Sequence, residues 1–170
     1  IEGNVESSNK IVNDLLDFSR EIHLQRTRVS IKPLIGETLA KIRIPEKIEI
    51  LDLTGNLPKV FVDADQIKRV FENLVKNAIE AMPKSGKLKI KSEEVDGGLK
   101  VTFQDTGIGI PSQNFPRLFT PMFTTKAKGV GLGLAICKRI IDAHGGVIDI
   151  ESKEGIGTCV TVIIPIGKQK

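Results

Sequence analysis

The chain has 170 residues, of which 40% are hydrophobic and 27% charged, with a net charge of +4. This composition is that of a globular domain with its own core, and it excludes a fibrous or compositionally disordered chain. The chain lacks Trp and Tyr and has no Lys/Arg cluster interleaved with aromatic residues, so we expect no binding to nucleic acid. Its apolar runs are too short to span a membrane, and it opens without methionine. We interpret it as a cytoplasmic fragment of a longer protein.

The first 26 residues are expected to form a helix. Apolar residues and two serines recur at alternating steps of four and three, at Ile1, Val5, Ser8, Val12, Leu15, Ser19 and Ile22. This spacing is that of a coiled-coil seam. It is consistent with a surface helix packed on its own domain and equally with one half of a helical hairpin that dimerises.

The rest of the chain alternates between strand and helix patterns. Strands are expected at 28–32, 48–53, 87–94, 99–105, 147–152 and 158–165, and helices at 33–42, from Asp63 or Asp65 to Met82, and at 131–144. Residues 106–130 are rich in Gly, Pro and Thr and predict a long functional loop. We therefore predict an α+β two-layer sandwich, with one mixed, mostly antiparallel sheet, helices on one face and an N-terminal helix before it. Cys137 and Cys159 lie in apolar patterns and are expected to be buried thiols of a reducing compartment.

The helix ending at Met82 has a polar stripe along the edge of its apolar face. The stripe contains Gln66, Asn73, Asn77 and Glu80 at helical spacing. Two asparagines one turn apart are poor helix formers. They are either solvated surface amides or oxygen ligands for a hard cation such as Mg²⁺.

Two further motifs are compatible with nucleotide chemistry. Asp105 shares a strand face with Val101 and Phe103, so it should point inward, where its carboxylate needs a donor such as the adenine amine. A simple Asp-Thr-Gly turn is the alternative. The glycine-rich segment 129–134 runs into a helix, whose free N–H groups would face an anion, with Lys126 just upstream. It matches neither the P-loop nor the dinucleotide fingerprint.

Taken in order, the motifs resemble those of the histidine kinases. Residues 72–78 (Glu-Asn-Leu-Val-Lys-Asn-Ala) resemble the N box, 105–109 the G1 box, 117–126 the F box, 129–134 the G2 box and 155–158 the last glycine motif. The ordered set covers about residues 30–165, and it looks most like the nitrogen-regulation type. The resemblance implies the Bergerat ATP-binding fold over residues 28–170. It implies that residues 1–27 belong to the dimerisation hairpin and its linker.

The resemblance also implies a set of site residues. Asn77 would hold Mg²⁺, Asp105 would read adenine with support from Gly109 and Thr158, and residues 115–130 would form a mobile ATP lid. The full set expected to contact ATP is Asn73, Asn77, Glu80, Asp105, Gly107, Gly109, Ile110, Phe119, Thr124, Thr125, Lys126, Gly129, Val130, Gly131, Leu132, Gly133, Leu134 and Thr158. The implied cofactors are ATP, with ADP as product, and Mg²⁺.

One position separates the branches of this superfamily. Its ATPases and anti-sigma serine kinases have a glutamate four residues before the magnesium asparagine, where this chain has Asn73. An amide is no general base. Glu72 lies about 100° away around the helix. The resemblance therefore favours a kinase that holds ATP and transfers its γ-phosphoryl group, rather than a gyrase-like ATPase.

The family's acceptor histidine is missing from this chain. His23 and His144 are its two histidines, and neither is followed by the acidic residue and proline of the acceptor motif. Neither is expected to have an acidic neighbour that could act as a base, and His144 is interpreted as a helix-end residue favoured by the dipole. The implied partners are a phosphoacceptor hairpin in the same or another subunit of a homodimer, and the receiver domain of a response regulator.

Overall fold

The computed structural model describes residues 2–126 and 129–167. Its helices are α1 (Glu2–Ser19), α2 (Ile31–Lys41), α3 (Ala64–Glu80) and α4 (Gly133–Ala143), with a 3-10 helix at Ser112–Arg117. Its strands are β1 (Thr27–Val29), β2 (Ile48–Leu53), β3 (Val60–Val62), β4 (Gly86–Val95), β5 (Gly98–Asp105), β6 (Val147–Lys153) and β7 (Gly157–Pro165). No helix within this described part is both long and apolar enough to cross a bilayer.

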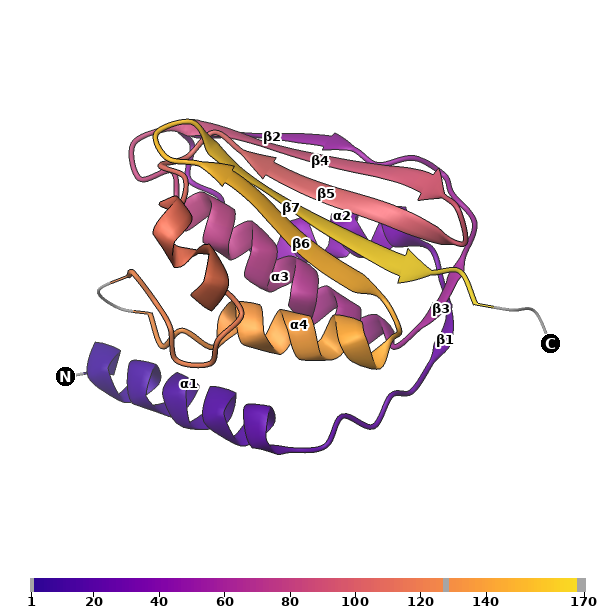
Figure 1. The fold of residues 1–170 in the computed structure, drawn as a ribbon, viewed down its shortest axis with the longest axis horizontal. Coiled ribbons are helices and arrows are strands. Elements are labelled where there is room, and N and C mark those ends of the chain that lie inside the picture. The colour runs from indigo at the N-terminus through magenta and orange to yellow at the C-terminus, as the bar shows by residue number, and fades with distance from the viewer. Residues whose placement is uncertain (1, 127–128, 168–170) are drawn as a thin grey trace.

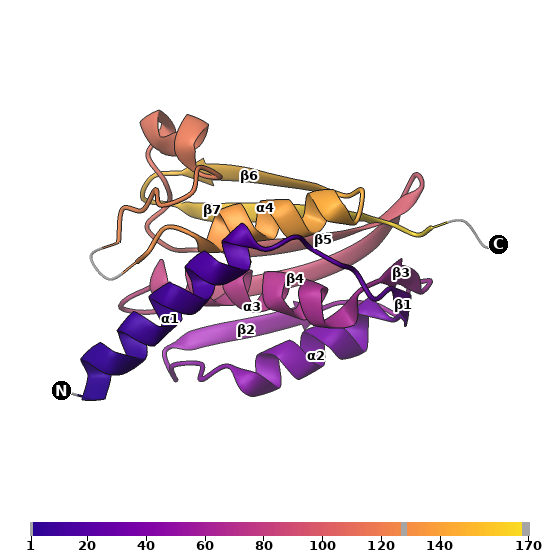
Figure 2. The ribbon, with the colours of Figure 1, turned by 90° about the horizontal axis from the view of Figure 1, so that it is seen from below.

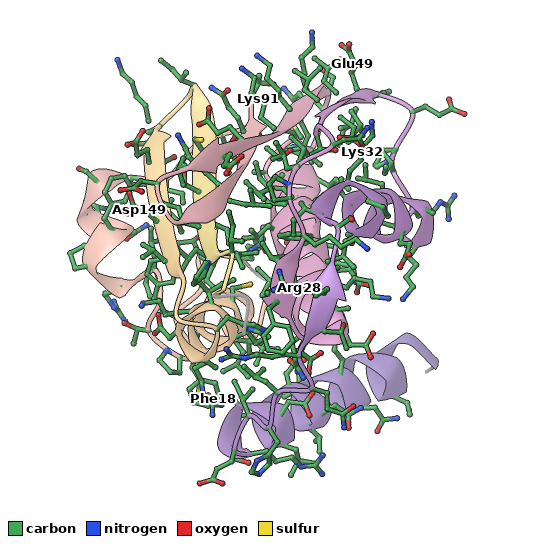
Figure 3. All side chains as sticks on the ribbon, turned by 90° about the vertical axis from the view of Figure 1, so that its right-hand side faces the viewer. Phe18, Arg28, Lys32, Glu49, Lys91 and Asp149 are labelled. Atoms are coloured by element: carbon green, nitrogen blue, oxygen red, sulfur yellow. The ribbon has the colours of Figure 1, made fainter. Side chains whose placement is uncertain are left out.

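Five strands form one twisted sheet in the order β2-β4-β5-β7-β6, in which β2 and β4 are parallel and the other neighbours antiparallel. Helices α2, α3 and α4 cover one face of this sheet, and α1 lies below α4 (Figure 1). The other face is open to solvent, and Lys91 and Asp149 lie on it (Figure 3). The predicted α+β sandwich is therefore confirmed.

The core lies between the sheet and α3. Alternate residues of β5 face inward, and Val101 and Phe103 are at most 2% exposed. Phe103 meets Phe71 of α3 with ring centroids 5.4 Å apart, a distance typical of favourable aromatic pairs. Helix α3 begins where Asp63 Oδ1 accepts a hydrogen bond from the Gln66 amide, so Asp63 is the N-cap. This core fixes the ends of β5 and α3, which carry the candidate site.

The N-terminal helix is shorter than predicted, since α1 ends at Ser19 rather than near residue 26. Carbonyl groups at its C-terminal end accept hydrogen bonds from a side chain of another helix. The Arg139 guanidinium of α4 donates to the carbonyl oxygens of Phe18 and Arg20 and stacks on the Phe18 ring, 4.9 Å from its centroid. Those carbonyls would have accepted the next helical hydrogen bonds. Figure 2 shows α1 crossing beneath the domain, and Figure 3 shows Phe18 at the contact with α4.

Three other expectations need correction. The expected strand at 28–32 is β1, which pairs antiparallel with the unpredicted strand β3 in a small sheet of its own. The helix expected from residue 33 begins at Ile31, because Ser30 is extended and serves as its N-cap. Cys137 is buried, and desolvation raises the pKa of its thiol to about 12. Cys159 is only half-buried, because β7 turns it toward the open face of the sheet.

His144 is the C-cap residue of α4, as expected, but the contacts of its ring differ from the expectation. Its side chain is buried at the end of α4, where Nδ1 lies 2.7 Å from the Ile140 carbonyl oxygen and Nε2 accepts a hydrogen bond from the Asp63 amide at 3.0 Å. A ring nitrogen that accepts a hydrogen bond has no proton, so the imidazole is neutral. Desolvation by burial lowers the pKa of His144. His144 is at the end of α4 as predicted, but its neutral ring is held there by hydrogen bonds rather than by the helix dipole, and it connects α4 to the start of α3.

This arrangement predicts that acidification destabilises the domain. The unfolded chain binds a proton at His144 below a pH of about 6.5, whereas the folded chain resists protonation. The free energy of unfolding should therefore fall as the pH drops below about 6.5. Urea titrations at several pH values measure this slope. His144→Gln, whose amide oxygen can still accept from Asp63, should lose part of the slope, and the exposed-site control His23→Gln should retain it.

Candidate functional site

Asn73, in the middle of the polar stripe of α3, lies beside Gly133 at the start of α4. Asn73 and Asn77 are half-buried, and a Cβ atom added to Gly133 would lie 3.4 Å from Asn73 Oδ1. Glu72 points elsewhere, since its carboxylate lies 3.9 Å from Lys41 of α2. The turn of α3 thus presents two amides to the site and holds the neighbouring carboxylate away from it.

Asp105 ends β5 and is 7% exposed, as its strand position predicted. Its Oδ1 accepts hydrogen bonds from the amides of Gly107 at 2.8 Å and Thr158 at 3.2 Å. Among the described residues no donor is in hydrogen-bond contact with Oδ2. Desolvation raises the pKa of Asp105, and the two backbone amides oppose that rise. One carboxylate oxygen therefore supports the fold, and the other is available to an external donor.

Glycines let three backbone segments approach one another around Asp105. Gly109 has a φ of +69°, and a Cβ there would clash with the carbonyl of Lys153, the last residue of β6. A Cβ on Gly107 would clash with the carbonyl of Ala81, which caps α3. The turn after β5 is therefore pressed against both the end of α3 and the β6–β7 turn.

Ser152 is a residue of this region that sequence reasoning missed. Its hydroxyl lies 2.8 Å from the Ile110 amide, which donates to it, and 2.7 Å from the Thr158 hydroxyl. It joins the G1-like turn to the start of β7. Nothing in its strand pattern distinguished it, because serine at an alternating strand position is ordinary.

Lys126 reaches across to α3. Its ammonium is 3.1 Å from Asn77 Oδ1 and forms an ion pair with Glu80. Its backbone amide donates to the Thr124 hydroxyl at 3.0 Å, and its carbonyl accepts from the Gly129 amide at 3.2 Å. Three predicted site residues, Asn77, Glu80 and Lys126, therefore meet in one place.

The start of α4 is open to an anion. The N-cap residue of this eleven-residue helix is Leu132, whose apolar side chain cannot accept a hydrogen bond. The first backbone amides of α4 therefore have no hydrogen bond to a capping side chain. Gly131 has a φ of +74° and lies against the backbone of Met122 and Phe123. The helix N-terminus and the Asn73 side chain thus face the same region.

The remaining predicted residues serve mainly as packing or lie at the rim. Phe119, Val130 and Leu134 are partly buried against the core and Leu132 is fully buried, whereas Thr125 is exposed. In the expected lid, residues 127 and 128 lie outside the described part of the chain. An unpredicted contact within it places the Arg117 guanidinium over the Phe123 ring, 4.4 Å from the centroid.

The linker is tied to the end of the domain remote from Asn77. The Gln25 amide donates to Asp63 Oδ2 at 2.9 Å, and the Arg26 guanidinium donates to the Ala143 carbonyl at 2.9 Å. The expectation that neither histidine has an acidic neighbour was wrong for His23, whose Nε2 is 3.6 Å from the Glu21 carboxylate. Both side chains of that pair are largely exposed.

Comparison with known proteins gives a consistent result. Residues 62–168 match the family model described as histidine kinase-, DNA gyrase B-, and HSP90-like ATPase. The chain is 36% identical to the signal transduction histidine-protein kinase AtoS of Escherichia coli K12, over 97% of this chain and 28% of AtoS. The chain thus spans less than a third of that relative's length.

Two solved structures are similar over almost the whole chain. Histidine kinase ThkA, in a complex with the response regulator protein TrrA, superposes with a TM-score of 0.81 at 35% identity, over 98% of this chain and 49% of that one. Full-length ShkA in complex with AMPPNP superposes with a TM-score of 0.85 at 27% identity, over 99% of this chain and 37% of that one.

Proposed function

Since this chain belongs to the family of histidine kinase-, DNA gyrase B- and HSP90-like ATPases, we propose that it is the ATP-binding catalytic portion of a sensor histidine kinase. It would bind ATP with Mg²⁺ and present the γ-phosphoryl group to a histidine outside this chain. The phosphoryl group would then pass to an aspartate of a response regulator. The observation that supports this best is the meeting of Asn77, Glu80 and Lys126 beside a helix N-terminus, with Asp105 at the neighbouring strand end.

The proposed roles follow from the geometry of the residues. Asp105 Oδ2 would accept the adenine amine, while Oδ1 remains bound to the backbone. The N-terminal amides of α4 and the Lys126 ammonium would neutralise phosphate charge. Transfer of a phosphoryl group demands placement and charge stabilisation more than covalent chemistry from the protein.

Mg²⁺ fits the donor set of the site. The ammonium of Lys126 shows that a cation can bind beside Asn77 Oδ1 and the Glu80 carboxylate. Mg²⁺ prefers oxygen ligands of this type, together with phosphates and water. When bound, the ion would neutralise charge on the transferred phosphoryl group. Asn77 would hold it, with Glu80 nearby.

The site favours transfer over hydrolysis. Asn73 occupies the position at which the family's ATPases have a general base, and an amide cannot accept the proton of an attacking water. Glu72 is the neighbouring carboxylate, and its contact with Lys41 keeps it on another side of α3. We therefore propose that a base on the acceptor domain completes the reaction.

Helix α1 would be part of the dimerisation hairpin, with residues 1–27 as the hairpin segment and linker and 28–170 as the catalytic domain. Its seam residues Val5, Val12 and Leu15 are 57%, 53% and 40% exposed. Its other side contacts the domain, where Asp17 pairs with Arg69 of α3 at 3.0 Å. The apolar seam is exposed while another side of α1 is docked on the domain, which supports a further helix as partner, and hence a homodimer of the whole protein.

Asn77→Ala is expected to make nucleotide binding largely insensitive to Mg²⁺. The substitution removes the proposed ligand oxygen, and alanine is the better helix former, so α3 should remain intact. Calorimetric titration of ATP with and without Mg²⁺ measures the effect. Asp65→Ala is the matched control, because its side chain is 91% exposed at the other end of α3. A full magnesium effect in Asn77→Ala would assign the metal to Asn73 or Glu80 instead.

A further inference from the structure

Lys126 is held by side chains of α3 that are far from it in the sequence. Its ammonium is 3.1 Å from the amide oxygen of Asn77, 49 residues away, and pairs with the carboxylate of Glu80, 46 residues away. The hydrogen bonds of its backbone with Thr124 and Gly129 hold it in a turn that aims the side chain at α3. We call this three-residue contact of Lys126, Asn77 and Glu80 the Lys126 latch.

The latch uses the oxygen that a metal ion at Asn77 would use. Mg²⁺ binds its ligands at about 2.0–2.1 Å. With the ammonium 3.1 Å from the same oxygen, the two cations could be at most about 5 Å apart. Mg²⁺ requires a near-octahedral shell in which it keeps several waters, so the ion and the ammonium would compete for the same amide oxygen and for the neighbouring carboxylate. The latch and a metal ion on Asn77 should therefore exclude each other.

Resting on the proposed function, we propose that Lys126 is a tethered substitute for the magnesium ion. Without nucleotide, its ammonium neutralises the Asn77–Glu80 end of α3 and ties the segment before residue 127 to that helix. When nucleotide binds with Mg²⁺, Lys126 leaves Glu80 and its charge moves to the phosphates. Binding of the metal complex and release of this segment are then one event.

The exposure of the latch suits such an exchange. The Lys126 and Glu80 side chains are 40% and 55% exposed, so the pair is screened by water and easily opened. A buried pair would instead resist separation. The latch therefore holds the segment without blocking the entry of nucleotide.

Carbodiimide cross-linking of the unmodified protein tests this proposal. The reagent joins a carboxylate to an amine only when the two are in contact, and mass spectrometry of the digested protein identifies the joined peptides. Lys100 and Glu93 provide an internal control, because they form a comparable pair at 2.8 Å between β4 and β5, with exposures of 34% and 61%. Samples contain no addition, Mg²⁺ alone, ATP alone, or ATP with Mg²⁺, and calorimetry measures nucleotide binding separately.

We expect a Lys126–Glu80 cross-link without additions, and its nearly complete loss with Mg²⁺ and ATP together. At a hundredfold excess over Kd, only about 1% of the protein remains unbound. The Lys100–Glu93 product should stay constant in all samples. Two results would overturn the latch: no Lys126–Glu80 product when the control pair reacts, or an undiminished product when calorimetry shows bound Mg²⁺ and ATP. A lack of nucleotide binding would refute the proposed function itself, whatever the cross-links show.

Discussion

Asp105→Asn is expected to weaken ADP binding roughly tenfold to a hundredfold while the domain stays folded. Asparagine can keep its oxygen on the amides of Gly107 and Thr158, as Asp105 Oδ1 does now. Its NH₂ group would then face the adenine amine, so that a donor meets a donor. Loss of a hydrogen bond to a charged group is worth about 1.5–3 kcal/mol, which corresponds to that range of affinity.

The same substitution should not lower the stability of the fold. Burial raises the pKa of Asp105 above its unfolded value of 3.8. When the pKa of a carboxyl group is higher in the folded chain, the free energy of unfolding falls as the pH rises from the unfolded pKa through the folded pKa. This loss of stability persists at neutral pH. The neutral amide avoids this loss, so urea unfolding at pH 7 should show equal or greater stability in Asp105→Asn.

Calorimetry with ADP decides the binding part of this prediction. Asp149→Asn is the matched control, because Asp149 lies on the open face of the sheet and the substitution makes the same change of charge. Wild-type affinity in a folded Asp105→Asn protein would place adenine elsewhere. Unfolding of the variant would show that the negative charge, and not only Oδ1, supports the turn after β5.

The isolated chain is expected to bind ATP without phosphorylating itself. Both ring nitrogens of His144 are engaged within the fold, and the residue lies eleven positions beyond Gly133 along α4, about 16 Å from the phosphate-facing end. His23 is exposed and has the Glu21 carboxylate nearby. It is therefore excluded as a phosphoryl acceptor by its distance from the nucleotide site and not by the lack of an acidic neighbour. Two residues later, Gln25 is bound to Asp63 at the start of α3, about 20 Å from Asn77 along that helix.

Incubation with γ-labelled ATP tests this expectation. No acid-labile label should remain on the chain alone. A separate dimerisation hairpin with an acceptor histidine should become labelled, weakly, because the effective concentration supplied by the covalent tether is lost. Label on the chain alone would contradict the prediction, and His23→Gln would then identify the acceptor. A hairpin that stays unlabelled while ATP binds would argue against transfer to histidine.

Much of the fold could be predicted from local pattern. The apolar residues of the strand at 48–53 and of the two strands that close the chain predicted the extents of these strands within a residue or so. It also placed Asp105 on the core side, since a strand has a period of two regardless of what packs on it. The N-cap at Asp63 and the turn between β4 and β5 likewise depend on residues close in sequence. The ordered motifs predicted a family, to which the comparisons then assigned the chain.

Only the tertiary structure decided the features that depend on partners remote in sequence. The seam pattern of α1 continues to Ile22, yet Arg139, more than a hundred residues later, takes the carbonyls that would have continued the helix. The place of His144 at a helix end was predicted, but its burial and its hydrogen bond with the Asp63 amide, which make the ring neutral, were not. The pairing of Lys126 with Asn77 and Glu80 arises where a loop meets a helix. Local periodicity describes one helix or strand at a time. The hydrogen bonds, burial and charge of a side chain depend on the residues that pack against it, and these are often distant in the sequence.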